Sequence, residues 1–456
     1  MELDRRHILG LTGAAAGIAA VTAGSGSGHA AAPISAFGID ATHFGVRPGS
    51  PDDQSAALQR AIAHVARARV PLALMPGNYL VGDLDLPPGT QIVGVRGATK
   101  LVLARGRSLL ASRQADGVTL SGLVLDGGGK TLPERHGLLH LLNGNGVRIL
   151  DCEIVDSGRH GIYLDAIGGE IAGSTITGAA AVAILSFDAR GLTIARNDVR
   201  RAGNNGIQIL RRRNGTDGTM VLDNRIEDVS DRDGGSGQYG NGINAHRAGN
   251  VIVRGNRIGG CAFSAVRGNA ASNIQIVGNS CDNLGEVALY SEFGFEGAII
   301  AHNTVVDAEI GVSVCNFNEG GRLAVVQGNI FRNLMPRRRA LTHPHESHGI
   351  GIAVEADASV TGNVVENASV AGIMLGYGAY LRDVAVTGNV VRQSEVGVAV
   401  SVVPGTGAAL IADNLITGSK RGAIVGVERK KIVTGDLSRD GAARYAHLAI
   451  SGNRVP

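Results

Sequence analysis

The stretch Ile274-Gln275-Ile276-Val277-Gly278-Asn279 recurs along the chain with small changes. Two further copies are Val251-Ile252-Val253-Arg254-Gly255-Asn256 and Val384-Ala385-Val386-Thr387-Gly388-Asn389. Each copy is a short run rich in β-branched residues, which is typical of a strand, and each run ends at Gly-Asn. Because glycine adopts the backbone dihedrals of tight turns at no steric cost, the repeated unit is predicted to be a strand followed by a turn.

The asparagine of this unit returns through most of the chain. The gaps between neighbours are 27, 32, 23, 24, 26, 34, 26, 25 and 39 residues, so the basic period is in the low twenties with insertions. Cys152 and Ser174 occupy the same place in two earlier copies. The recurring residues are Asn197, Asn224, Asn256, Asn279, Asn303, Asn329, Asn363, Asn389, Asn414 and Asn453.

A second submotif, glycine followed by an aliphatic residue, falls after each asparagine. Each unit then holds two or three strands of about three to five residues, which cannot bury an apolar face alone and must stack on their neighbours. Stacked asparagines can pass side-chain amide hydrogen bonds from one unit to the next. Copies of the submotif begin at Gly161, Gly206, Gly242, Gly311, Gly372 and Gly397.

The period decides among repeat architectures. Helical repeats do not fit the β-branched content and the glycines, and a propeller needs longer blades of about 40–45 residues in a common type. We therefore predict an all-β solenoid, a right-handed single-stranded parallel β-helix with an N-terminal capping α-helix. It should contain roughly a dozen coils spaced by about 4.8 Å.

Composition and charge agree with this fold. The 456 residues include 68 Gly and no Trp, 44% are hydrophobic and 3% are aromatic, which excludes a disordered linker and favours a core of small aliphatic residues. The formal net charge of +3 gives no reason to expect nucleic acid as a partner. Four Cys are too few to form a disulfide framework, and Cys261 and Cys281 are expected to be buried as small apolar residues.

The first folded stretch contains the best helix in the sequence, over residues 51–68. Asp52 and Asp53 can cap its N-terminus, and Leu58, Ile62 and Val65 share one face. Short strand-like pieces follow at 72–75, 79–81, 91–95 and 101–103. Together with Phe44-Gly45 and Pro76-Gly77-Asn78-Tyr79, this region resembles the N-terminal cap of pectate-lyase-like right-handed β-helix proteins, in which a helix plugs the end of the coil. The repeats at 118–456 resemble those of the same superfamily.

The N-terminus reads Asp4-Arg5-Arg6-His7-Ile8-Leu9, then a weakly apolar stretch, then small residues up to Pro33. Paired arginines before such a stretch are typical of a twin-arginine signal peptide, although Asp4 and Gly10 depart from the usual pattern. With the repeats, the chain resembles a family of TAT-translocated repetitive proteins. This predicts three parts: a signal peptide at 1–32, a cap with the first coils at 33–117, and β-helix repeats at 118–456. The mature protein is expected in the periplasm or outside the cell, exported folded by the twin-arginine translocase and not inserted in the membrane.

Candidate site residues lie on the outward side of the strands that begin with glycine and an aliphatic residue. Apolar positions face the core, so the alternating positions form an outward ladder, which is polar in its middle copies. Two insertions, 228–239 and 336–347, precede such strands and are expected to rim this face. In pectate-lyase-like enzymes this sheet forms a sugar-binding groove, so a polysaccharide is the predicted partner. The expected substrate-binding residues are Gln208, Asn244, Asn269, Phe293 and Asn316.

The expected catalytic residues are His246, Arg267, Tyr290 and Glu292. β-Elimination or C5 epimerisation of a uronic acid needs a base and a cation that neutralises the carboxylate. Arg267 suits the cation, and His246 or Tyr290 suits proton transfer. The chain lacks the Asp-Pro-His-Asp signature of periplasmic alginate epimerases of this fold.

The predicted function is therefore that of an exported polysaccharide lyase or epimerase that acts on a uronic-acid-containing glycan, and two alternatives remain open. A glycoside hydrolase needs two carboxyl groups about 5–9.5 Å apart, and Glu292 requires a second carboxylate from a loop, such as Asp231, Asp233, Glu296 or Glu346. A non-catalytic carbohydrate-binding or envelope-scaffold protein is the other alternative. No metal site is predicted, since His343, His345 and His348 match no fixed ligand spacing. The residues indicate no cofactor, and the family resemblance allows calcium.

Overall fold

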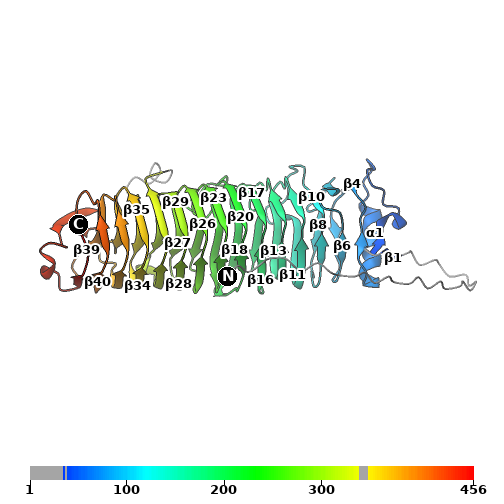
Figure 1. Cartoon of the computed structure of the whole chain (residues 1–456). Coiled ribbons are helices and arrows are strands. Elements are labelled where there is room, and N and C mark those ends of the chain that lie inside the picture. The colour runs from blue at the N-terminus through cyan, green and yellow to red at the C-terminus, as the bar shows by residue number, and fades with distance from the viewer. Residues whose placement is uncertain (1–33, 36–37, 338–347) are drawn as a thin grey trace, which may run out of the picture.

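The computed structural model describes residues 34–35, 38–337 and 348–456, and it is a parallel β-helix. Figure 1 shows a rod of stacked coils with α1 (Ser55–Ala68) across its N-terminal end. The predicted signal peptide lies outside the described residues. Among the residues described, no helix is long and apolar enough to cross a membrane.

Each central coil contributes three strands, and each strand pairs in parallel with its equivalent in the next coil. One coil consists of β23 (Arg257–Cys261), β24 (Val266–Asn269) and β25 (Ile274–Val277). These strands pair with β26 (Ser280–Leu284), β27 (Val287–Glu292) and β28 (Glu296–Ala301). The strands therefore form three rows along the rod, which we call the first, second and third row.

The first row is a sheet of fourteen strands, so the rod has slightly more coils than the dozen predicted. The additional coils include strands of the N-terminal region. Besides β23 and β26 this row holds β4 (Gly77–Val81), β7 (Thr99–Leu103), β10 (Val124–Asp126), β12 (Glu153–Val155), β14 (Thr175–Thr177), β17 (Asp198–Ala202), β20 (Arg225–Val229), β29 (Thr304–Ala308), β32 (Ile330–Leu334), β35 (Val364–Ala368), β38 (Val390–Arg392) and β41 (Leu415–Thr417).

The second row carries the submotif that begins with glycine and an aliphatic residue. Two of its strands, β11 and β13, continue into the third row, so the two rows form one sheet. Besides β24 and β27 it holds β5 (Leu84–Asp85), β8 (Leu110–Ser112), β11 (Gly137–Leu150), β13 (His160–Ala172), β15 (Ile184–Phe187), β18 (Asn205–Thr216), β21 (Asn241–Gly249), β30 (Ile310–Val314), β33 (Ile350–Val354), β36 (Ala371–Leu375), β39 (Val396–Ser401) and β42 (Ile424–Glu428).

The third row carries the strands that end at Gly-Asn. Two short antiparallel pairs flank the rod: β1 (Ile34–Ser35) beside β2, and β43 (Lys431–Asp436) beside β42. Besides β25 and β28 the row holds β2 (Gly38–Asp40), β3 (Leu72–Ala73), β6 (Gln91–Val93), β9 (Thr119–Ser121), β16 (Leu192–Ala195), β19 (Met220–Leu222), β22 (Ile252–Arg254), β31 (Arg322–Gln327), β34 (Ala356–Thr361), β37 (Arg382–Thr387), β40 (Ala409–Ala412) and β44 (Leu448–Ser451). Short 3-10 turns occur at Ala41–Phe44, Phe317–Glu319 and Ala442–Arg444.

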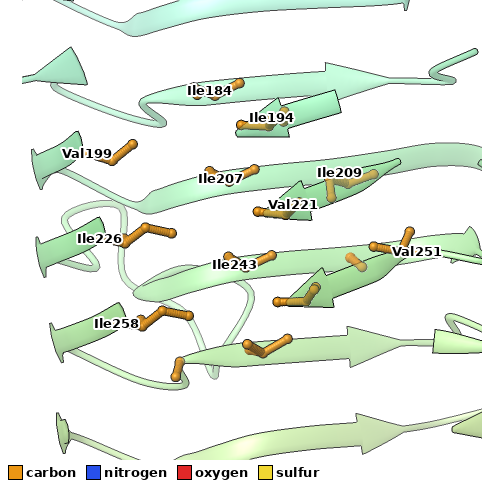
Figure 2. Packing of buried hydrophobic residues seen from close by; sticks show 14 of the residues in the cluster. Ile184, Ile194, Val199, Ile207, Ile209, Val221, Ile226, Ile243, Val251 and Ile258 are labelled. Carbon is orange, nitrogen blue, oxygen red and sulfur yellow. The ribbon is translucent and has the colours of Figure 1, made fainter. Parts of the chain in front are cut away.

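The core consists of aliphatic side chains that stack from coil to coil. Figure 2 shows Ile207 and Ile243 above one another in the second row, with Ile226 and Ile258 doing the same in the first. Their exposed fractions are 0–1%. Because each aliphatic residue touches its equivalents above and below, the stack buries a continuous apolar face that no single coil could bury.

Asparagines connect the coils on the inside of the turns. Each side-chain amide donates to the side-chain oxygen of the next asparagine at 2.9–3.0 Å. The same oxygen also accepts the backbone N–H of the preceding asparagine, at 2.9–3.1 Å. Ser174 and Cys152 extend the row toward the N-terminus, since Ser174 N–H donates to Asn197 and Cys152 N–H donates to Ser174. The predicted asparagine ladder is thus present.

The N-terminal helix closes the core. It begins at Ser55, four residues later than the sequence pattern predicts, because Asp53 makes a β-bridge with Leu80 and its carboxylate accepts the Ser55 N–H at 2.8 Å. Leu58, Ile62 and Val65 are fully buried against the first coils. Cys261 and Cys281 are buried and free, as expected.

The ladder leads to a stability prediction at Asn279, whose side chain is buried at the centre of the rod. In Asn279→Ala the Asn256 amide loses its acceptor and the Asn303 oxygen loses a donor. Since buried unpaired polar groups cost about 1–3 kcal/mol each, the unfolding free energy should fall by roughly 2–4 kcal/mol. Thermal and denaturant unfolding should show this loss, with the exposed Asn318→Ala as control. Equal stability of the two variants would contradict a structural role of the ladder.

Candidate functional site

The second row presents two parallel ladders of side chains on its outer face. The first ladder runs from Gln208 through Asn244 and Arg267 to Tyr290, in register across four coils. The second runs from Leu210 through His246 and Asn269 to Glu292. The sequence predicted this register, and the structure confirms it.

These outward side chains are nevertheless largely covered. The exposed fraction is 8% for Gln208, 5% for Asn244, 7% for Arg267 and 2% for Glu292. The loop between β20 and β21, residues 230–240, folds over this face because Asn244 Nδ2 donates to the Gln238 carbonyl at 3.0 Å and Asn241 Nδ2 donates to the Gly237 carbonyl at 2.9 Å. The first predicted insertion therefore rims the face, whereas residues 338–347 of the second lie outside the described residues.

The loop and the two ladders enclose a cavity of about 360 Å³, which we call the central cleft. Its size is at the lower end of the usual range for ligand pockets. Six of the nine residues singled out from the sequence line it, and Tyr290, Glu292 and Asn316 do not. The lining residues are Gln208, Leu210, Ser236, Gln238, Tyr239, Asn244, His246, Arg267, Asn269 and Phe293.

Arg267 lines the central cleft but is largely enclosed by other side chains and by the loop. Its Nε donates to Glu292 Oε1 at 2.6 Å, its Nη1 lies 3.4 Å from Glu286 Oε2, and its guanidinium carbon lies 5.0 Å from the centre of the Tyr290 ring. A Cβ built on Gly237 would lie 1.6 Å from Arg267 Nη1, so the loop backbone packs directly on the guanidinium. Two carboxylates already neutralise this one cation. A role for Arg267 in binding a substrate carboxylate stays a prediction, and these contacts weigh against it.

Glu286 is the residue of this site that sequence reasoning missed. It lies one residue before β27, outside the aligned strand, and its side chain is 3% exposed. A buried carboxylate needs a partner, and the guanidinium of Arg267 in the preceding coil supplies one. The sequence does show a glutamate directly before a predicted core strand. It does not show the partner of this glutamate, because that partner depends on how the turns stack.

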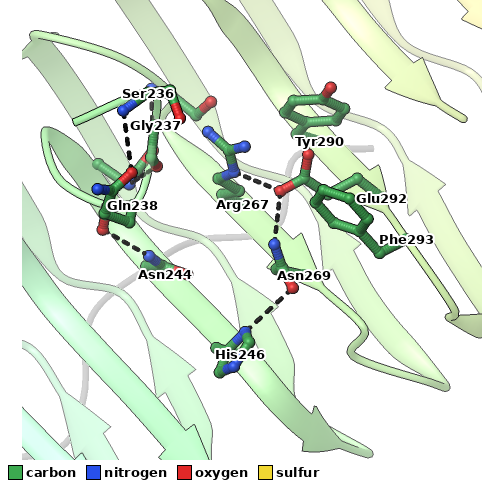
Figure 3. A network of polar contacts seen from close by, with 12 residues as sticks. Ser236, Gly237, Gln238, Asn244, His246, Arg267, Asn269, Tyr290, Glu292 and Phe293 are labelled. Carbon is green, nitrogen blue, oxygen red and sulfur yellow. Dashed lines mark hydrogen bonds and ion pairs between the residues drawn. The ribbon is translucent and has the colours of Figure 1, made fainter. Parts of the chain in front are cut away.

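His246 and Asn269 connect the ion pair of Arg267 and Glu292 to the cleft. Asn269 Nδ2 donates to Glu292 Oε1 at 2.9 Å, and Asn269 Oδ1 lies 3.0 Å from His246 Nδ1 (Figure 3). Burial lowers the pKa of His246 below its ordinary value of 6.5, because desolvation disfavours the imidazolium. A neutral imidazole that lines the cleft can accept a proton.

Two amides in the cleft have unused hydrogen-bonding capacity. Asn244 Oδ1 is buried without a hydrogen-bond partner among the described residues. Gln208 makes no side-chain hydrogen bond within that same part of the chain, although 92% of its surface is buried. Unpaired buried polar groups cost free energy unless a ligand or water satisfies them. The first ladder therefore offers donors and acceptors to a bound molecule.

Tyr290, Phe293 and Asn316 lie at the C-terminal side of the cleft. The Cys315 thiol points at the Tyr290 hydroxyl at 3.7 Å, and burial raises the pKa of Tyr290 well above its ordinary value, which makes this phenol a poor base. Asn316 Oδ1 accepts the Phe293 N–H at 3.1 Å, and Phe293 remains 40% exposed beside the cleft. Of the predicted proton-transfer residues, His246 is the one that lines the cleft.

Two of the other candidate carboxylates, and two further carboxylates that follow second-row strands (Glu355 after β33 and Asp188 after β15), have partners elsewhere. Asp233 pairs with Arg159, and Glu296 pairs with Arg322. Glu355 accepts the Phe317 N–H at 2.8 Å, and Asp188 pairs with Arg212. His343, His345 and Glu346 lie outside the described residues. Within the residues described, no group of three or more His, Cys, Asp or Glu side chains could hold a metal ion.

The contact between Gly237 and Arg267 gives a testable prediction. Gly237→Ala should displace the loop, because the added Cβ would overlap Arg267 Nη1 and φ is +117°. The expected cost is roughly 1–3 kcal/mol of unfolding free energy, with faster hydrogen exchange of residues 230–240. Gly234→Ala is the matched control, since its φ is also positive and nothing lies within 4 Å of its Cβ. Equal effects of the two substitutions would contradict a tight contact between loop and guanidinium.

Comparisons with known proteins agree with this architecture. Residues 110–226 and 160–331 match the family model described as the right handed beta helix region. None of the curated protein sequences compared with the chain matches it.

Several solved structures share the fold at low sequence identity. The N-terminal fragment of gene product 12 of bacteriophage Phi29 is 16% identical with a TM-score of 0.55, over 86% of this chain and 69% of that one. The catalytic unit of the thermostable GH87 alpha-1,3-glucanase of Streptomyces thermodiastaticus is 15% identical with a TM-score of 0.52, over 93% and 70%. PfbA, a surface adhesin of Streptococcus pneumoniae, is 15% identical with a TM-score of 0.51, over 87% and 94%. The chain is therefore a right-handed parallel β-helix repeat protein.

Proposed function

We propose that the protein acts on a polysaccharide that binds in the central cleft, with His246 as the general base. The observation that carries this proposal is the convergence of the Gln208 amide, the unpaired Asn244 Oδ1 and His246 in one cleft. Amides donate to and accept from hydroxyl groups, which are the main polar groups of a sugar.

The aromatic residues of the cleft support a sugar as ligand. Tyr239 lines the cleft, and Phe293 exposes 40% of its surface at the edge. An aromatic ring can cover the apolar C–H face of a sugar while amides bind its hydroxyls. One structure of similar fold is the catalytic unit of a glucanase, which supports polysaccharide chemistry on such a scaffold.

The reaction that fits a neutral imidazole is proton abstraction, as in β-elimination or C5 epimerisation of a uronic acid. The base takes the proton next to the carboxylate, and hydrogen-bond donors stabilise the charge that develops. Since Glu286 and Glu292 already compensate Arg267, the Gln208 amide is the donor that we assign to the substrate carboxylate. A hydrolase has less support, because neither Glu286 nor Glu292 lines the cleft.

The place of action is part of the same proposal. The paired Arg5 and Arg6 and the small residues before Pro33 support export through the twin-arginine route. The substrate would then be a polysaccharide of the periplasm, the cell envelope or the surroundings.

A substrate screen tests this function. Purified protein is incubated with uronic-acid polysaccharides and with neutral glucans, and three quantities are followed: the ultraviolet absorbance of unsaturated product, the uronate configuration by NMR, and binding by calorimetry. We expect turnover of a uronic-acid polymer. Binding without turnover would favour the scaffold alternative, and neither binding nor turnover with any polymer would contradict the proposal.

Two variants separate binding from chemistry once a substrate is found. His246→Gln should lower turnover by roughly 10²–10⁴-fold with little change in binding, because it removes the base. Gln208→Ala should weaken binding by about tenfold, the effect of one lost hydrogen bond. His64→Gln, at an exposed position of α1, is the control. Full turnover by His246→Gln would rule out this base.

The pH dependence of turnover should follow from the pKa of His246. A base is active when deprotonated, and burial places this pKa below 6.5. Turnover should therefore persist as the pH falls through 6.5 and decline only at lower pH. An acidic limb above 6.5 in the kcat/KM profile would contradict this assignment.

A further inference from the structure

We infer that Glu292 and Arg267 are positioning residues, which act through Asn269 to keep the His246 proton on Nδ1 and to leave Nε2 as the basic atom. The role of His246 in catalysis rests on the proposed function. The position of its proton does not, because it follows from the hydrogen bonds alone.

The ion pair defines the first step of this relay. Arg267 Nε donates to Glu292 Oε1 at 2.6 Å, and both side chains are more than nine-tenths buried. A carboxylate that is held by a guanidinium in such surroundings is ionised and can only accept hydrogen bonds. Whatever else contacts Glu292 Oε1 must therefore be a donor.

Asn269 is the second step. Its side chain lies between Glu292 Oε1 at 2.9 Å and His246 Nδ1 at 3.0 Å (Figure 3). Because Glu292 needs a donor, the Asn269 amide must turn its NH₂ group toward the carboxylate. Its oxygen then faces His246, and the reverse orientation would place two acceptors against each other.

His246 is the last step. An amide oxygen only accepts, so Nδ1 must carry the proton, and in the neutral imidazole Nε2 is then the unprotonated nitrogen. Burial favours the neutral form, and the ring lines the central cleft. The relay thus sets both the tautomer and the orientation of the ring.

The charged groups around His246 agree with this state. On its own strand Arg247 disfavours the imidazolium, and from the coil two steps away Glu292 favours it. The nearest side chains in the flanking coils are Leu210 and Asn269, which carry no charge. Desolvation and Arg247 lower the pKa of His246 by more than Asn269 and Glu292 raise it, so this pKa stays below its ordinary value.

Direct contact of the ion pair with a substrate does not fit the geometry. Glu292 does not line the cleft, and Arg267 lines it with its charge already held between two carboxylates under the backbone of Gly237. A group covered in this way influences the reaction through its neighbours. This distinguishes Glu292 and Arg267, whose charges are paired within the protein, from His246, whose neutral ring lines the cleft.

The experiment is ¹⁵N NMR of the imidazoles in the full chain, with the His246 signals assigned by their loss in His246→Gln. We expect the neutral His246 ring to carry its proton on Nδ1. In Asn269→Leu the acceptor is lost, so the two tautomers should mix and the His246 pKa should fall further. Asn318→Leu, at an exposed position, is the control and should leave the spectrum of His246 unchanged.

A second variant tests the distant end of the relay. Glu292→Leu removes the acceptor that orients Asn269, so the Nδ1-protonated form should again lose its dominance. Where a substrate is available, both variants should lower kcat by up to roughly 10²-fold with little change in KM, and the acidic limb of the pH profile should move down for Asn269→Leu. Thermal unfolding shows whether each variant is folded.

The outcomes separate the inference from the proposed function. A wild-type ring protonated on Nε2, or a tautomer unaffected by Asn269→Leu, would overturn the relay, and neither result requires a substrate. If the relay is present but His246→Gln keeps full turnover, the proposed base is wrong and the positioning remains. If Glu292→Leu abolishes turnover while the His246 tautomer is unchanged, Glu292 takes part directly and the inference fails.

Discussion

The hydrogen bond from one asparagine side chain to the next is the interaction on which the rod depends from Asn197 to Asn453. Each asparagine oxygen accepts both a side-chain and a backbone N–H of the preceding asparagine, at 2.9–3.1 Å. These bonds keep every turn at the same place around the axis. Once the turns are aligned, the strands pair in register and the aliphatic residues stack in continuous columns. The outward positions then align as well, which is how residues of neighbouring coils that lie 23 to 36 positions apart in the sequence form one site.

The central cleft shows how a binding site can form on a regular repeat scaffold. The strands supply positions at fixed spacing, and the 230–240 loop supplies the cover that removes these positions from water. Without that cover Arg267 and Glu292 would be solvated surface charges with weak mutual attraction. With it, they become a buried pair that orients its neighbours. The irregular segment therefore determines what the regular face can do.

Sequence reasoning predicted the parts of this structure that follow from the repeat. Gly-Asn marks the turns, and the alternation after each Gly identifies which residues face outward. The structure confirms this alternation at Gln208, Asn244 and His246. It did not predict that Arg267 is buried, because its cover comes from a loop with no repeat. It also missed Glu286, whose partner lies in the preceding coil and is set by turn geometry. Periodic features were readable from the sequence, and contacts made by insertions were not.

The asparagine ladder also has a direction. From Asn197 to Asn414, each side-chain amide donates one N–H to the asparagine of the next coil toward the C-terminus, while its oxygen accepts from the coil on the N-terminal side. The amide dipoles along the row therefore point the same way and polarise one another. Its N-terminal end presents an acceptor, which the Ser174 N–H meets, and at its C-terminal end the Asn453 amide donates to the carbonyls of Ile411 and Ser451. The two ends of the rod are thus chemically different, and an added coil must enter with this same polarity to join the row.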